Sequence, residues 1–238
     1  MNMEKRKLNI LLLVFSLITS LMNAQNTANL DIQQQSLVKI SSLTATGNIG
    51  QLKNQLNEAL DNKLTINEIK EALVQLYAYC GFPRSLNAIN SFKTVLDERV
   101  SKGLKDKEGK KIIAENHPAD KYEQGRKVLE TLTQTPQLKP APGFGEFAPR
   151  IDAFLKEHLF ADIFAGDVLS FQQRELVTIA ALASMEGVES QLQAHINMGR
   201  NTGITKDQLF QIAEIIENTV NTNQAEIMRK IINTGDSK

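Results

Sequence analysis

The stretch QRELVTIAALASMEGVESQLQAHINMGRNTGITKDQL, residues 173–209, decides the fold, because a second stretch of the chain repeats its pattern. QQSLVKISSLTATGNIGQLKNQLNEALDNKLTINEI, residues 34–69, aligns with it once one residue is gapped near Gly47. The matches are Leu37, Val38, Ile40, Leu43, Gln51, Leu52, Asn57 and Thr65 with Leu176, Val177, Ile179, Leu182, Gln191, Leu192, Asn197 and Thr205. They fall on apolar and helix-capping positions alike, which indicates two diverged copies of one module.

Both copies carry the same helix-start signal. A Ser or Thr followed three residues later by Glu or Gln forms a capping box, which is typical of a helix N-terminus. The instances are Ser170 with Gln173, Thr65 with Glu68 and Thr205 with Gln208. Gly203 precedes the last of these and suits a left-handed helix terminus, whereas Lys63 at the equivalent place would carry a small strain in that conformation.

These signals and the apolar periodicity predict an all-α chain. The expected helices lie near 33–46, 51–61, 66–80, 84–100, 171–186, 189–201, 206–219 and 223–233, with two more over 120–132 and 145–158 and a turn over LFADIF. The segment from Phe171 to Met185 is apolar almost all round, so we expect its helix to be central.

Composition shifts divide the chain. We expect a signal peptide over 1–24, a first module over 32–101, a polar segment and Pro-rich linker over 102–143, and a second module over 144–238. The linker assignment rests on TQTPQLKPAPGFGEFAP, whose prolines and glycines favour an irregular connection.

The N-terminus has the pattern of a secretory signal. A charged start (Glu4 to Lys7) precedes an apolar run from Leu8 to Met22 and then Ala24. We therefore expect an exported protein, periplasmic or secreted, with no membrane attachment after cleavage. An uncleaved membrane anchor is the alternative. Met22, the third residue before the expected cleavage site, is larger than the small residue usual there.

Charge and cysteine content exclude several classes of protein. Lys plus Arg and Asp plus Glu are both 27, so no overall field attracts nucleic acid, and we expect no nucleic-acid partner. Cys80 is the single cysteine, so packing rather than disulfides must stabilise an exported chain. The absence of Trp and the abundance of Leu, Ile and Ala favour helices over a β-sandwich.

At RELVTIAALAS (174–184), QLQAHINMGRNTGIT (191–205) and LYAYCGFPRSLNAI (76–89) the chain resembles the carboxymuconolactone decarboxylase family, which includes the alkylhydroperoxidase D-like proteins. The resemblance implies the helical fold of that family in a tandem, two-module form. It leaves the reaction open, because the family contains cofactor-free decarboxylases, thiol peroxidases and proteins of unassigned activity.

The resemblance places Glu175 and His195 at the acidic and histidine positions of the family. A histidine transfers protons near neutral pH, and a carboxylate can orient it. The two lie on consecutive helices expected to pack antiparallel, at levels that differ by about 6 Å, so contact does not follow from spacing, and Thr178 is nearer in level to His195. The alternative is structural: Glu175 complements a helix dipole and His195 is a satisfied polar group. Copy one has Ser36 and Gln55 at these places, which cannot transfer protons at neutral pH.

Copy one offers a different candidate. Gly81 should end one helix and Pro83 begin the next, which leaves Arg84 beside the free N–H groups of a helix start. A guanidinium there favours an anion, so Arg84 is a candidate clamp for a substrate carboxylate. Pairing with a nearby Asp or Glu is the alternative. Tyr77 and Tyr79 are candidates to line the same pocket, or to pack in the core.

Cys80 is a redox candidate, although the peroxidase branch of the family uses a Cys-x-x-Cys pair on the helix that here carries His195, and this chain has no cysteine there. A buried, small apolar Cys80 is the alternative. His117 and His158 lie outside the modules, and no clustered ligands predict a metal site, so we expect no metal and no cofactor.

Three functions follow as hypotheses. The first is a cofactor-independent lyase acting on a small carboxylated or lactone substrate, in which Arg84 stabilises a dienolate, His195 reprotonates it and Glu175 orients His195. The second is peroxide reduction by Cys80. The third is a binding protein on a retired enzyme scaffold. The resemblance further implies a homo-oligomer, with a trimer suggested.

Overall fold

The computed structural model of the 238-residue chain describes residues 29–113 and 119–234, and within those ranges it contains helices and no strand. The predicted signal peptide and His117 lie outside the described residues. No helix in the described ranges has the length and apolar character needed to cross a membrane.

The first module consists of α2 (Ile32–Thr46), α3 (Ile49–Asp61), α4 (Ile66–Gln75) and α5 (Tyr77–Ser101). The capping box of Thr65 and Glu68 opens α4 as predicted. The helix expected over 66–80 is interrupted at Leu76, and Gly81 then takes a non-helical conformation (φ 82°, ψ 159°) inside α5. Gly81 and Pro83 therefore act as the break that the sequence indicates, one turn inside a longer helix.

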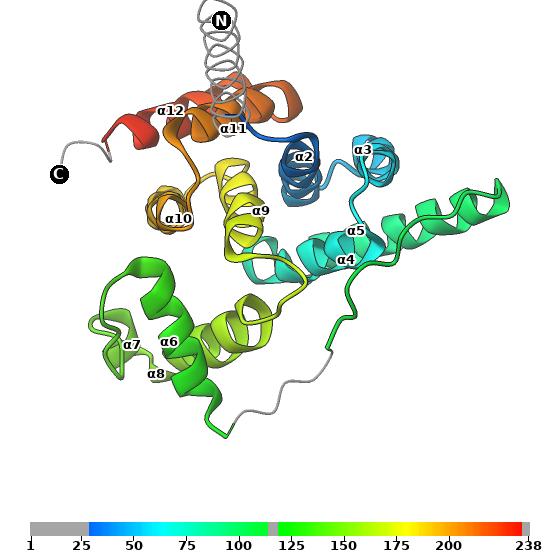
Figure 1. The fold of residues 1–238 in the computed structure, drawn as a ribbon. Helices are drawn as coiled ribbons and strands as arrows, with labels where there is room; N and C mark the ends of the chain where they lie inside the picture. The colour runs from blue at the N-terminus through cyan, green and yellow to red at the C-terminus, as the bar shows by residue number, and fades with distance from the viewer. Residues whose placement is uncertain (1–28, 114–118, 235–238) are drawn as a thin grey trace, which may run out of the picture.

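The repeated helices of the second module are α9 (Phe171–Ala183), α10 (Glu189–Asn201), α11 (Lys206–Thr219) and α12 (Thr222–Thr234). The capping boxes at Ser170 and Thr205 open α9 and α11, as the sequence predicts. Helix α9 lies at the centre of the molecule (Figure 1), and each of its residues from Arg174 to Ala183 is buried. The central position predicted from its apolar sequence is confirmed.

Between α5 and α9 lies a packed helical unit, whose C-terminal part falls within the predicted second module. It contains α6 (Lys121–Thr133), the short helices α7 (Phe144–Phe147) and α8 (Pro149–Ala153), and the π-helix η1 (Phe154–Phe164). The prediction of one helix over 145–158 followed by a turn over LFADIF is wrong: the chain stays helical to Phe164. The reason is burial, because Leu159, Phe160, Ile163 and Phe164 pack in one apolar cluster with Leu129 and Leu132 of α6.

Helices α6 and η1 approach closely at Gly125. A Cβ atom at this position would lie 1.7 Å from the backbone oxygen of Lys156, so only glycine fits there. This close contact between α6 and η1 places the Lys156 side chain in the interior, where its ammonium group donates to Asp152 and to the hydroxyl of Tyr122.

The two modules share their cores. The apolar cluster built mainly from α2 to α5 includes Val177 and Ala181 of α9. The cluster built mainly from α9 to α12 includes Val38 of α2, together with Leu30, which directly precedes α2. Because α2 lies beside α9, residues of each copy complete the core of the other (Figure 1).

Candidate functional site

Glu175 and His195 form a buried pair. The Glu175 carboxylate on α9 and the His195 ring on α10 meet with 2.8 Å between Oε2 and Nδ1. Glu175 is fully buried, and the His195 side chain keeps 9% of its surface exposed. The helix spacing alone did not decide whether Glu175 and His195 meet. They do meet, because α9 and α10 pack closely across the turn at Gly187.

The pairing determines which ring nitrogen carries hydrogen. A carboxylate only accepts hydrogen bonds, so Nδ1 of His195 donates to Glu175. In the neutral imidazole, Nε2 is then an acceptor, and it lies 3.4 Å from the hydroxyl of Tyr79. Burial, together with the Glu175 carboxylate, raises the pKa of Tyr79 well above its usual value, so this hydroxyl keeps its proton at neutral pH.

Tyr79 comes from the first module, at the start of α5. Its ring stands edge-on to the His195 ring, with the centroids 5.3 Å apart and the planes at 80°. His195 of copy two therefore has a residue of copy one, Tyr79, as its second side-chain neighbour.

A buried hydrogen-bond network lies behind Tyr79. Arg174 donates from Nη1 to Oε1 of Gln75 (3.1 Å), and Gln75 donates from Nε2 to the hydroxyl oxygen of Thr178 (2.8 Å). The Thr178 hydroxyl acts on Tyr79 as well, because it partly offsets the rise in the pKa of Tyr79. The network therefore joins Arg174 and Thr178 of α9 to Gln75 of the first module.

Arg174 was not singled out by the sequence reasoning. It is fully buried, and its Nη2 donates to Glu71 Oε2 and to the backbone oxygen of Gly166, both at 3.0 Å. Burial lowers the pKa of Arg174, and the ion pair with Glu71 opposes that effect. The available signal was a cation at the start of an otherwise apolar helix, because such a helix is buried and a buried charge needs partners.

One polar atom of the pair is unused. The Oε1 oxygen of Glu175 is buried and has no hydrogen-bond partner among the described residues. An unpaired buried carboxylate oxygen costs free energy, and functional sites are where such atoms persist. His195 in its charged form, or a bound group, would reduce that cost.

Arg84 lies in the first turn after the Gly81 break and is exposed to solvent. Its guanidinium is close enough to the Cys80 thiol to act on it: burial raises the pKa of Cys80, and Arg84 partly offsets the rise. Within the described ranges no carboxylate forms an ion pair with Arg84. Arg84 therefore stays available for an anion, on the far side of the Gly81 break from Tyr79.

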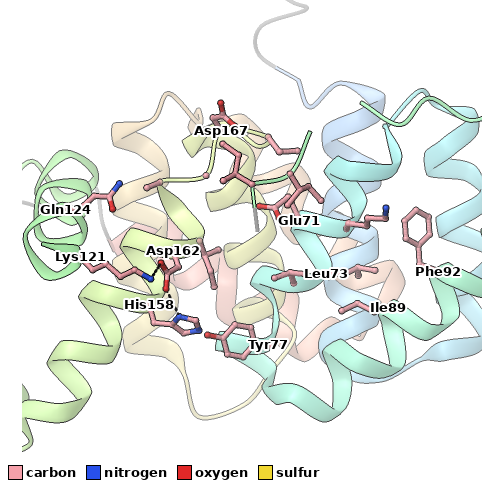
Figure 2. A pocket seen from close by; sticks show the side chains of 18 residues that line it. Glu71, Leu73, Tyr77, Ile89, Phe92, Lys121, Gln124, His158, Asp162 and Asp167 are labelled. Atoms are coloured by element: carbon pink, nitrogen blue, oxygen red, sulfur yellow. Dashed lines mark hydrogen bonds and ion pairs between the residues drawn. The ribbon is translucent and has the colours of Figure 1, made fainter. Parts of the chain in front are cut away.

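Tyr77 and Tyr79 lie in different surroundings. Tyr77 stacks on Phe82, with ring centroids 4.6 Å apart, and lines a cavity together with His158 (Figure 2). Tyr79 contacts His195 instead. Side chains two residues apart on a helix point about 200° apart around the helix axis, so Tyr77 and Tyr79 do not share one face.

The equivalent region of the first module has no Glu–His pair. Ser36, at the place of Glu175, donates to the backbone oxygen of Ile32 and accepts from Asn62. Gln55, at the place of His195, donates to Glu58. Continuing the alignment from Thr65 puts Thr219 at the place of Tyr79, and Gln55 and Thr219 line one cleft of 320 Å³. The equivalent positions are thus occupied by Ser36 and Gln55, in place of the Glu175–His195 pair.

In the part of the chain that the structure describes, no three His, Cys, Asp or Glu side chains gather closely enough to hold a metal ion. The candidate site is therefore built from Glu175, His195 and Tyr79, with Arg84 nearby on the chain and Arg174, Gln75 and Thr178 behind.

Comparison with known proteins supports the family and the two-module form. The model of the carboxymuconolactone decarboxylase family matches two regions, residues 13–94 and 149–231. A 4-carboxymuconolactone decarboxylase of Acinetobacter baylyi (strain ATCC 33305 / BD413 / ADP1) is 28% identical over 93 residues, which are 39% of this chain and 69% of that protein.

Proposed function

The chain belongs to the carboxymuconolactone decarboxylase family, and we propose that it is a cofactor-independent lyase that acts by acid–base chemistry on a small carboxylated or lactone substrate. The observation that carries the proposal is the buried contact of 2.8 Å between Glu175 and His195, with the Tyr79 hydroxyl on the other ring nitrogen. A histidine held in this way has one defined tautomer and one nitrogen available to a reacting group.

The proposed reaction needs one proton. When a carboxylated lactone loses carbon dioxide, the electron pair of the broken carbon–carbon bond stays on the remaining molecule as a dienolate. Charged His195 delivers the Nε2 proton to the dienolate carbon, and Glu175 stabilises the imidazolium through Nδ1. The histidine then regains a proton from water for the next turnover.

Two further groups have proposed roles. Tyr79 keeps its proton at neutral pH and hydrogen-bonds the Nε2 side of His195, so it positions the ring and is displaced or shared when substrate binds. Arg84 has no ion-pair partner among the described residues, and its guanidinium would hold the substrate carboxylate or the developing negative charge.

The test is turnover of 4-carboxymuconolactone and a panel of small carboxylated lactones, measured as carbon dioxide release. His195→Ala is expected to lower kcat by at least about 10²-fold, because a positioned acid–base group contributes that much or more. Glu175→Gln should lower kcat and shift its pH profile, since the amide no longer stabilises the imidazolium.

Gln55→Ala is the matched control, because Gln55 occupies the place of His195 in the other copy and should leave kcat unchanged. Full activity in His195→Ala protein would contradict the proposal. Binding of a panel compound without turnover by the unmodified protein would instead support the binding-protein alternative.

Cellular location and assembly are parts of the same proposal. We propose that the protein is exported and forms a homo-oligomer. N-terminal sequencing of protein from the extracellular or periplasmic fraction tests cleavage after Ala24, and light scattering on a sizing column tests assembly. A full-length N-terminus in the cytoplasmic fraction, or a monomer at micromolar concentration, would contradict the respective part.

A further inference from the structure

A cavity of 930 Å³ is lined by residues of α4 and α5 but not by His195. It is enclosed by α4, α5, the N-terminal end of α6, the C-terminal part of η1, and the segments at 112–113 and 165–168 (Figure 2). None of Tyr79, Glu175 and His195 lines it, so it is separate from the candidate site. Its size is within the range of small-molecule sites.

Most of the cavity wall is apolar. The residues that form it are Leu73, Val74, Tyr77, Ile89, Phe92, Ile112, Ile113, Ile163 and Val168. Val74 and Ile113 remain 40% and 72% exposed, so the protein itself leaves apolar surface open to water here. Covering apolar surface is favourable by about 25 cal/mol per Å², and a ligand with an apolar body would gain that free energy.

One end of the cavity is polar, as Figure 2 shows. Asp162 lies between two partners, with Lys121 Nζ 2.7 Å from its Oδ1 and His158 Nδ1 3.1 Å from its Oδ2. Since the carboxylate only accepts, Nδ1 of His158 donates to it and Nε2 is left as an acceptor. The Tyr77 ring is 5.5 Å from the His158 ring, so a phenol and an imidazole stand together at this end.

The carboxylates around the cavity are already compensated. Each of the three has a cation: Glu71 pairs with Arg174, Asp162 with Lys121 and Asp167 with Lys110. Lys70 also lines the cavity, and it donates to the side chain of Asn67. Burial and the Asp162 charge raise the pKa of Tyr77, so its hydroxyl is neutral at physiological pH. A cationic ligand would therefore lose hydration without gaining a dedicated counter-ion.

We propose that this cavity binds a neutral, mostly apolar molecule that carries a hydroxyl group, with its hydrocarbon body against the apolar wall and its hydroxyl donating to His158 at the polar end. The site is formed in part by the helical unit between α5 and α9, so it does not depend on the repeat or on the acid–base pair.

The test is direct binding of 2-naphthol, which has an apolar ring system and one hydroxyl. The chain has no Trp, so the naphthol fluorescence can be followed without tryptophan emission from the protein. We expect saturable binding of one molecule per chain. Val74→Glu, which puts a carboxylate on the apolar wall, should weaken binding at least tenfold.

Leu86→Glu is the matched control, since Leu86 is also an exposed apolar residue (52%) but does not line the cavity, and its binding should be unchanged. His158→Ala should reduce the preference for 2-naphthol over naphthalene by about two- to tenfold, the value of one hydrogen bond. Far-ultraviolet circular dichroism verifies that each variant is folded. Absence of saturable binding, or equal binding by the Val74→Glu protein, would overturn the proposal, and an unchanged naphthol preference in His158→Ala would overturn the hydroxyl contact.

Discussion

Arg174 and Glu175 are adjacent, both fully buried and oppositely charged, yet they serve different partners. Consecutive residues of a helix point about 100° apart, so Arg174 faces the first module and Glu175 faces α10. Arg174 pairs with Glu71 and Gln75, whereas Glu175 pairs with His195. At the scale of single residues, the fate of each buried charge is set by which neighbouring helix its side chain meets.

The protonation state of Cys80 is likewise set by its surroundings, and these favour the neutral thiol. Burial raises the pKa of its thiol despite nearby Arg84, so little thiolate exists at neutral pH. We expect iodoacetamide to alkylate Cys80 more slowly than free cysteine at pH 7, with the rate rising at a higher pH than the ordinary value of about 8.5. Mass spectrometry across a pH series measures this.

Peroxide consumption is the companion assay for Cys80. Cys80→Ser and unmodified protein should remove hydrogen peroxide at the same rate, because a thiol that stays protonated is a poor nucleophile. Fast alkylation at pH 7, with loss of peroxide consumption in Cys80→Ser, would favour the peroxidase alternative instead.

The buried pair of Asp152 and Lys156 should matter for stability. Burial acts to raise the pKa of Asp152, but the hydrogen bonds from Lys156 and Tyr122 offset this and hold the pKa below its usual value. We expect Asp152→Asn to lower the free energy of unfolding by about 3–5 kcal/mol, because Lys156 is left charged and unpaired in the interior. Urea denaturation at pH 7 measures the change.

Asp97→Asn is the matched control, since Asp97 pairs with Lys93 at the same i,i+4 spacing but with side chains 69% and 77% exposed. It should change stability by no more than about 0.5 kcal/mol. Since the folded-state pKa of Asp152 is lowered, its contribution is present at neutral pH and is lost as the pH falls through the folded value, below about pH 4. Equal effects of the two substitutions would contradict this account.

Helix ends show how closely the two copies kept one local plan. Gly203 precedes α11 with φ 96°, and Lys63 at the equivalent place before α4 has φ 73°. The left-handed conformation predicted for Gly203 is present, and Lys63 adopts it as well, where it carries strain because lysine has a Cβ atom. The loop geometry is therefore shared although copy one has lysine at this place.

Lys63→Gly should accordingly stabilise the protein by about 0.5–1 kcal/mol, because glycine adopts this backbone conformation without steric cost. Gly203→Ala is the reciprocal variant and should destabilise by a similar amount. Thermal unfolding midpoints measure both. A lower midpoint for Lys63→Gly would show that Lys63 makes an interaction worth more than the strain.

At the scale of the whole molecule, the repeat does not produce two independent domains. Val38 of α2 is fully buried among residues of α9 to α12, and Val177 of α9 packs with the first module. Because each copy completes the core of the other, neither can expose its interface without losing apolar burial. The candidate site has the same character, since Tyr79 and His195 come from different copies.

We therefore expect one cooperative unfolding transition. Val38→Ala should lower stability by about 2 kcal/mol through the cavity it creates, and hydrogen exchange should accelerate in α11 as much as in α4. Val100→Ala, at a position 70% exposed, is the control and should leave exchange unchanged. Faster exchange confined to α2–α5 would show that the modules unfold separately.

Much of the architecture could be predicted because its signals are local. Capping boxes, left-handed caps and apolar periodicity depend on residues within one or two turns, so the helix positions of both modules agree with prediction to within a few residues. The segment at 145–164 was predicted less well, since its π-helix exists only because α6 packs on it. The local sequence pattern of this segment does not indicate that α6 packs on it.

The sequence by itself determined the duplicated helical plan, the central place of α9 and the asymmetry between Glu175 and His195 in one copy and Ser36 and Gln55 in the other. Tertiary structure alone decided that Glu175 reaches His195, that Tyr79 and Tyr77 have different neighbours, and that Arg174 anchors a network across the copies. The physical reason is range: a helix is specified by neighbours along the chain, whereas a buried polar contact depends on the sub-ångström packing of helices that are distant in sequence.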